Sequence, residues 1–157
     1  AVELGDSLIA EGAKEYVIDD AELERVKNNY PVIWKNPDAT PKLCFVGCPH
    51  LSMEQLKDWT VKVEEKLAKS DKKKVTIPTV FTAAPAVLKA FNETEYADRL
   101  KATGIITSYI CPLMYMNNPL CKKMPVITSS NKLRTYTSAR YHTDAEILEI
   151  ITGGSDK

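Results

Sequence analysis

The chain alternates short apolar runs with longer amphipathic segments, and this alternation is typical of an α/β fold. Apolar runs at 42–46, 75–81, 105–110 and 126–127 predict four strands. The first run is nearly all apolar, which suits a strand buried on both faces. Pro78 lies inside the second run and indicates an edge strand or a bulge there, because proline cannot donate to a sheet.

The segments between these runs have helical periodicity. Ser52 is expected to cap a helix that extends to about Lys69, since Gln55 stands at the capping-box position. Thr143 starts the last helix in the same way, with Glu146 three residues later. Two more helices are predicted over 83–91 and 95–103, and one before Pro31 that begins at Asp19 or Asp20.

Strands that alternate with helices imply a parallel sheet covered on both faces, so we expect a three-layer αβα domain with about four strands, mainly parallel. Residues 16–157 would form this domain, which includes a β-prone run at 16–18, and residues 1–15 a linker or N-terminal extension. The carboxyl ends of parallel strands lie on one edge, where ligands bind. The long loop at 111–125 and the hydroxyl-rich segment at 128–141 would flank that edge.

The composition of the chain limits the classes of partner that we expect it to bind. The chain has 157 residues, 44% of them hydrophobic, with 21 basic and 21 acidic residues and a formal net charge of zero. Nucleic-acid and membrane-surface binders usually carry excess positive charge, so we expect neither partner. The sequence shows no membrane-length apolar run and no secretory signal, which favours a cytoplasmic protein with reduced cysteines.

Three cysteines stand in loops rather than in strands. Cys48 and Cys111 each follow an apolar run and precede a proline, and Cys121 lies in the same loop as Cys111. Thiolates on fixed loops suit an iron–sulfur cluster, and three of them would leave one iron open as a Lewis acid. Cys44 lies inside a strand and is expected in the core.

Two other interpretations of the cysteines stay open. A zinc site could use the C-x3-C pair Cys44 and Cys48, although Cys111 and Cys121 are too far apart to form a second pair of that kind. Alternatively the chain is a metal-free α/β interaction module in which all four cysteines are buried thiols.

Polar residues near these cysteines are candidates for substrate chemistry. His50 is placed to transfer a proton, and its alternative role is that of a hydrogen-bonded structural histidine. The segment 128–136 offers hydroxyls, an amide and the cations Lys132 and Arg134, which could bind a carboxylate or phosphate. The same segment could also be a polar surface loop.

Three motifs together resemble the aconitase X family. They are Gly-Cys-Pro-His-Leu-Ser at 47–52, Ile-Cys-Pro at 110–112, and Thr-Ser-Ser-Asn-Lys at 128–132 followed by Tyr136. The resemblance extends over about 16–154 and covers what would be the carboxyl-terminal third of that family's large catalytic subunit. It implies an aconitase-like fold and a piece of a longer subunit that is inactive by itself.

The resemblance also implies a hydro-lyase with an iron–sulfur cluster, 4Fe-4S, that dehydrates a hydroxy acid. A small swivel-domain subunit would supply a serine base, and the rest of the large subunit would complete the site. The loop 114–121 looks more like the archaeal type, which acts on mevalonate 5-phosphate in a mevalonate pathway; the bacterial alternative acts on cis-3-hydroxy-L-proline. The implied cluster ligands are Cys48, Cys111 and Cys121, the implied catalytic residue is His50, and the implied substrate-binding residues are Ser52, Ser129, Ser130, Asn131, Lys132 and Arg134.

Overall fold

The structure is a computed structural model that describes residues 5–154, in two units divided after Pro31. The first unit contains a short 3-10 helix, Gly5–Leu8, and α1 (Asp20–Asn28). Asp19 caps α1 as expected, because its carboxylate accepts a hydrogen bond from the Glu22 backbone N–H at 2.8 Å. The β-prone run at 16–18 forms no strand, and its three side chains are 67–68% exposed.

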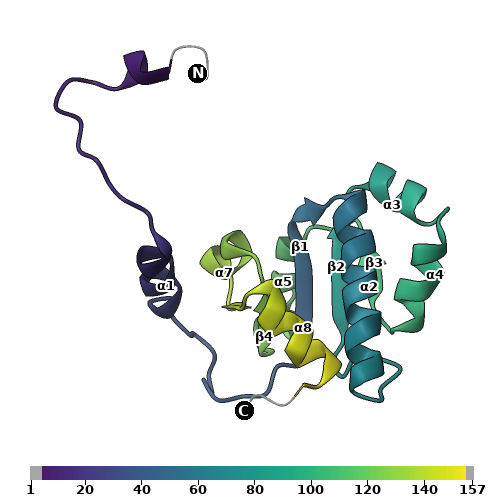
Figure 1. The fold of residues 1–157 in the computed structure, drawn as a ribbon. Helices are drawn as coiled ribbons and strands as arrows, with labels where there is room; N and C mark the ends of the chain where they lie inside the picture. The colour runs from purple at the N-terminus through teal and green to yellow at the C-terminus, as the bar shows by residue number, and fades with distance from the viewer. Residues whose placement is uncertain (1–4, 155–157) are drawn as a thin grey trace. The chain divides into compact units, whose positions relative to one another are not determined.

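The second unit is built on a parallel sheet of five strands in the order β3-β2-β1-β4-β5 (Figure 1). All four pairs of neighbouring strands are parallel, which confirms the predicted α/β fold. The strands are β1 (Leu43–Leu51), β2 (Thr79–Ala83), β3 (Ile106–Ser108), β4 (Val126–Thr128) and β5 (Arg140–Tyr141). The helices are α2 (Met53–Lys69), α3 (Pro85–Phe91), α4 (Glu95–Ala102), α5 (Pro112–Met116), α6 (Pro119–Lys122), α7 (Asn131–Tyr136) and α8 (Asp144–Thr152).

The two faces of the sheet carry separate apolar clusters, because successive strand residues point to opposite faces. Cys44 and Val46 of β1 belong to a large cluster with the apolar sides of α2, α3, α4 and α8. Leu43 and Phe45 belong to a smaller cluster with Met116 of α5 and Leu133 of α7. Helices therefore cover both faces, and the smaller cluster lies under short helices.

Several details of the predicted strands are wrong: β1 runs on to Leu51 instead of ending at residue 46, and β3 covers only 106–108 of the predicted 105–110. β2 starts at residue 79 rather than 75, and it lies between β1 and β3, so it is not an edge strand. Pro78 stands just before the strand, where its missing N–H interrupts no ladder and its carbonyl accepts a hydrogen bond from Cys44 at 2.9 Å. The fifth strand, β5, was not predicted, because two residues carry no periodic signal.

The loop regions contain more helix than the sequence indicates. Pro112 and Pro119 stand in the first turns of α5 and α6, where a proline's fixed φ is compatible with a helix. The hydroxyl-rich segment forms α7, which Ser130 caps. No helix among residues 5–154 is both long and apolar enough to cross a bilayer.

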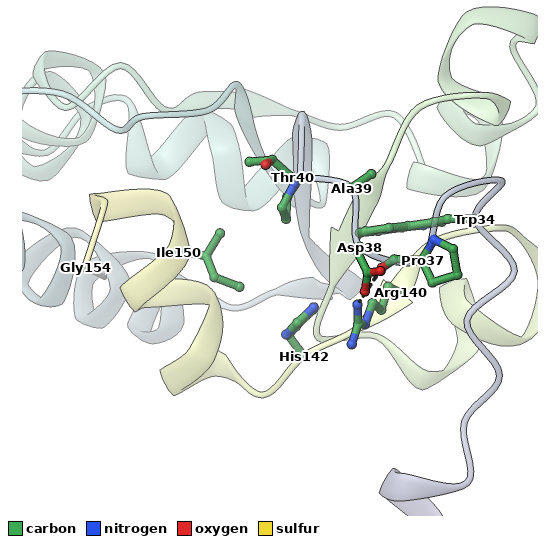
Figure 2. Close-up of a pocket in the computed structure, with 10 residues that line it drawn as sticks. Trp34, Pro37, Asp38, Ala39, Thr40, Arg140, His142, Ile150 and Gly154 are labelled. Carbon is green, nitrogen blue, oxygen red and sulfur yellow. Dashed lines mark hydrogen bonds between the residues drawn. The ribbon is translucent and has the colours of Figure 1, made fainter. Parts of the chain in front are cut away.

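The segment before β1 is attached to the domain through Trp34, whose indole N–H donates to the Ser138 carbonyl at 2.8 Å. The Arg140 guanidinium lies 5.7 Å from the Trp34 ring and donates to the Pro37 carbonyl at 3.3 Å. A pocket of about 460 Å³ opens beside this arrangement, lined also by Asp38 and His142 (Figure 2). It adjoins residues 37–41, which directly precede β1, and so lies at the amino end of that strand.

A substitution at Thr143 tests whether the capping box stabilises the start of α8. Thr143 accepts from the Glu146 N–H at 3.3 Å, and the Glu146 carboxylate accepts from the Thr143 N–H at 2.7 Å. We expect Thr143→Ala to lower the free energy of unfolding by about 1 kcal/mol, because the Glu146 N–H at the partly buried helix start loses its hydrogen-bond acceptor. Urea denaturation measures the change. Thr143→Ser is the matched control and should stay near wild type; an equal loss in both variants would contradict the capping role.

Candidate functional site

The motif at 47–50 lies in a break of the β1–β2 pairing. The two strands are in register up to Val46, which pairs with Phe81, and pairing resumes where Leu51 meets Ala83. Four residues of β1 therefore stand opposite a single residue of β2, Thr82. The extra residues cannot join the ladder and must leave the plane of the sheet, and this bulge carries Cys48 and His50.

Glycine is required at the start of this bulge. Gly47 has φ +108°, a conformation that L side chains rarely adopt. A Cβ there would lie 2.3 Å from the Thr82 carbonyl oxygen and 2.7 Å from its hydroxyl oxygen. The Thr82 hydroxyl donates to the Gly47 carbonyl at 2.5 Å. The next peptide bond, between Cys48 and Pro49, is cis.

The predicted residues of this motif differ in exposure. Cys48 is half-buried and packs against the smaller apolar cluster, whereas His50 is exposed. Ser52 completes the predicted capping box of α2, accepting from the Gln55 N–H at 3.2 Å and donating to the Glu54 carboxylate at 3.0 Å. The pKa of Glu54 is lowered, first by its own backbone N–H and then by the Ser52 hydroxyl.

Cys111 stands at the start of α5, and the segment around it is held by hydrogen bonds to Ser108, the last residue of β3. The Ser108 hydroxyl accepts from the Ile110 N–H at 3.1 Å and shares a hydrogen bond of 2.9 Å with the Tyr115 hydroxyl. The Tyr115 ring stacks on Phe45 of β1, with the centroids 5.4 Å apart. These contacts bring α5 from β3 back across the face of β1.

The third loop cysteine and the polar segment complete the candidate set. Cys121, in α6, is half-buried and packs against the same cluster as Cys48. The segment after β4 lies next to the bulge, because β1 pairs with β4 up to Phe45 and Thr128. The bulge of β1, Cys111 after β3 and the polar segment after β4 thus lie at the carboxyl edge of the sheet. Cys121 stands nearer the other end of the β3–β4 connection, next to Lys122, which lines a pocket before the start of β4.

Within the polar segment, Ser130 has a structural role. It is buried, and its hydroxyl accepts from the Leu133 N–H at 3.0 Å to cap α7. The Asn131 side-chain oxygen accepts from the Arg134 guanidinium at 2.5 Å. Ser129 is half-buried and Lys132 is exposed. The exposed members of the set are therefore Asn131 and Lys132, with Ser129 and Arg134 partly covered.

The cysteines fit an iron–sulfur cluster in chemistry but are not assembled around one. Cys48, Cys111 and Cys121 are free thiols, and each is half-buried: Cys48 in the bulge of β1, Cys111 at the N-cap of α5 and Cys121 in α6. Cysteine thiolates are the usual ligands of such clusters. No three side chains of histidine, cysteine, aspartate or glutamate among residues 5–154 stand close enough to hold a metal ion. The chain by itself therefore offers ligands of the right kind without a finished site.

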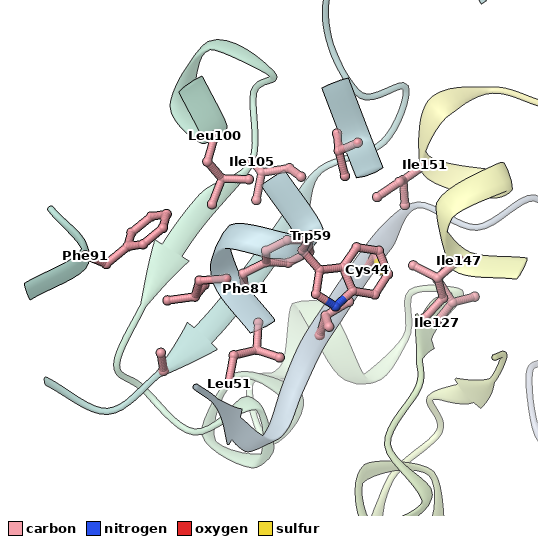
Figure 3. Packing of buried hydrophobic residues seen from close by; sticks show 14 of the residues in the cluster. Cys44, Leu51, Trp59, Phe81, Phe91, Leu100, Ile105, Ile127, Ile147 and Ile151 are labelled. Atoms are coloured by element: carbon pink, nitrogen blue, oxygen red, sulfur yellow. The ribbon is translucent and has the colours of Figure 1, made fainter. Parts of the chain in front are cut away.

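Cys44 is a core residue, as expected. It is fully buried among Trp59, Phe81 and Ile127 on the face covered by α2 and α8 (Figure 3). Burial raises the pKa of its thiol, and the Asp144 carboxylate adds to the shift. Cys48 packs on the opposite face, so the C-x3-C pair does not form a zinc-binding pair.

Comparison with known proteins agrees with the motifs. The family model of the aconitase X third domain matches residues 41–151. The chain belongs to the aconitase X family. No curated protein sequence matches it. Aconitase X of Thermococcus kodakaraensis, solved in its holo form, has the same fold with a TM-score of 0.63 and 18% sequence identity. The match covers 88% of this chain and 36% of that one, so this aconitase X chain spans little more than a third of the solved relative.

Sequence reasoning missed three residues that shape the site: Thr82, Ser108 and Tyr115. Each lies in a segment that reads as an ordinary strand end or loop. Their importance depends on strand register, which places Thr82 opposite the bulge and Ser108 beside Thr82.

Replacing two glycines with alanine separates backbone strain from crowding. Gly104 also has a positive φ, +85°, but a Cβ there would meet nothing closer than 3.7 Å. We expect Gly104→Ala to cost roughly 1–2 kcal/mol, the strain alone. Gly47→Ala should cost clearly more or prevent folding, because its Cβ would overlap Thr82. Urea denaturation and circular dichroism compare the two, and equal losses would contradict the described geometry.

Proposed function

We propose that the chain is the third domain of an aconitase X large subunit, part of an iron–sulfur hydro-lyase that dehydrates a hydroxy acid. The observation that carries this proposal is the bulge at 47–50, which presents the family motif at the carboxyl edge of a parallel sheet, the edge where such sheets bind ligands. The polar segment after β4 lies beside it.

Cys48 and Cys111 are the proposed cluster ligands, with Cys121 as the third or with a ligand from outside this chain. The half-buried position of these thiols supports the assignment. When bound, the cluster would supply an open iron that acts as a Lewis acid. The exposed imidazole of His50, on the same bulge as Cys48, would hold or deliver a proton at the substrate.

Mevalonate 5-phosphate is the proposed substrate. Lys132 and Arg134 stand on α7, directly after the strand that pairs with β1. Two cations at this position would bind a phosphate group through charge-assisted hydrogen bonds. Asn131, which already accepts from Arg134, would hold that guanidinium in place.

The proposed partners follow from the fraction of the site present here. The chain spans 36% of the solved aconitase X it matches, and its three loop cysteines do not converge by themselves. We therefore propose that the rest of the large subunit completes the site, and that a small swivel-domain subunit supplies the serine that removes the substrate proton.

Metal analysis of the assembled enzyme tests the cluster. We expect iron and sulfide after anaerobic purification, and loss of both in Cys48→Ser and Cys111→Ser, because each removes a thiolate ligand. Cys44→Ala is the control, since Cys44 lies on the other face of the sheet. An assembly with neither iron nor sulfide would refute the proposal, and stoichiometric zinc would favour a structural metal site instead.

Kinetics of the assembled enzyme test the substrate. We expect Lys132→Ala and Arg134→Ala each to raise KM for mevalonate 5-phosphate by roughly tenfold, which is the loss of one hydrogen bond to a charged group. Lys123→Ala is the control, because Lys123 lines a separate pocket at the amino side of β4. Turnover of cis-3-hydroxy-L-proline alone would contradict the assignment.

A further inference from the structure

We propose that Thr82 and Ser108 are positioning residues, each of which anchors one of the two loops that carry Cys48 and Cys111. This inference rests on the proposed role of those cysteines as cluster ligands. The two hydroxyl residues pair with each other across β2 and β3. They form a short polar row at the carboxyl ends of β2 and β3.

Thr82 holds the first loop at the point where it leaves the sheet. Its side chain is fully buried, and its hydroxyl donates to the Gly47 carbonyl at 2.5 Å, with the Val46 carbonyl at 3.5 Å. A buried hydroxyl without a partner is costly, so this bond favours one position of the Gly47 carbonyl. Cys48 follows immediately, and the direction in which the bulge departs is therefore set by Thr82.

Ser108 holds the second loop in an equivalent way. Its oxygen accepts from the Ile110 N–H, one residue before Cys111, and also bonds the Tyr115 hydroxyl in α5. Cys111 thus lies in the chain between Ile110 and Tyr115, which both hydrogen-bond the Ser108 hydroxyl. Tyr115 in turn stacks on Phe45 of β1, which ties the second loop to the strand that carries the first.

This arrangement predicts separate effects on the two cysteines. Among residues 5–154, the Thr82 hydroxyl bonds the Cys48 loop and not the Cys111 loop, whereas the Ser108 hydroxyl bonds within the Cys111 loop and α5. A general loss of stability would expose both thiols together. A positioning role changes one thiol at a time.

The test measures alkylation of each cysteine by iodoacetamide in the metal-free 157-residue chain, read by peptide mass spectrometry. Thr82→Val should raise the rate at Cys48 about fivefold, the ratio that corresponds to one lost hydrogen bond, and leave Cys111 unchanged. Ser108→Ala should do the reverse. Thr82→Ser should restore the wild-type rate, because it keeps the hydroxyl.

Thr60→Val is the matched control for Thr82→Val. Thr60 is equally buried and donates to the Leu56 carbonyl at 2.7 Å within α2, away from both loops. Unchanged alkylation of Cys48 in folded Thr82→Val, or an equal rise at every cysteine in Thr60→Val, would overturn the proposal.

Tyr115→Phe keeps the test decisive if Thr82→Val does not fold. It keeps the ring that stacks on Phe45 and removes only the hydroxyl bonded to Ser108, so it should raise the rate at Cys111 alone; no change there would overturn the proposal.

The alkylation results do not depend on a cluster. An assembled wild-type enzyme without iron refutes the proposed function, and alkylation decides the positioning roles separately.

Discussion

The pairing of β1 with β2 is the constraint on which the candidate site depends. Both ends of the bulge are fixed, because the ladder is in register up to Val46 and again at Leu51. The four intervening residues have one backbone residue, Thr82, opposite them, so their path is determined by the sheet rather than by loop flexibility. Glycine is the residue type that allows this path at position 47, because Thr82 occupies the space that a side chain there would need.

The two faces of the sheet differ in the helices that cover them and in the cysteines that they carry. The larger cluster lies under the long helix α2 and under α8, and it contains the inert thiol of Cys44. The smaller cluster lies under α5 and α7, which have five and six residues, and Cys48 and Cys121 pack at its margin. Elements with few buried contacts are the ones that can rearrange at low cost. Cys48 and Cys121 therefore lie on the face that the short helices cover.

The segment that contains Cys111 and Cys121 also exposes large apolar side chains. Tyr109, Met114 and Leu120 are 63%, 65% and 77% exposed, and all three lie in the segment that contains Cys111 and Cys121. The chain spans 36% of the solved aconitase X. Exposed apolar side chains gathered in one segment are typical of a surface that another domain or chain covers, which is the role we propose for the rest of the large subunit.

The sequence by itself determined the elements whose signals are local. The capping boxes at Ser52 and Thr143 start α2 and α8 as predicted, the apolar run before Gly47 is a buried central strand, and Cys44 is core. The alternation of strands and helices indicated the parallel sheet, and the motif with Cys48 indicated the family. These features depend on residues near one another in the chain, so periodicity and capping chemistry are enough to find them.

Only the tertiary structure decided the features that depend on register between distant segments. The start of β2, the two-residue strand β5, and the position of Thr82 opposite the bulge follow from which residues face each other across the sheet. The contact of Ser108 with Tyr115 depends on α5 crossing back over β1. Sequence spacing does not encode these pairings, because a shift of one residue in register would exchange every partner.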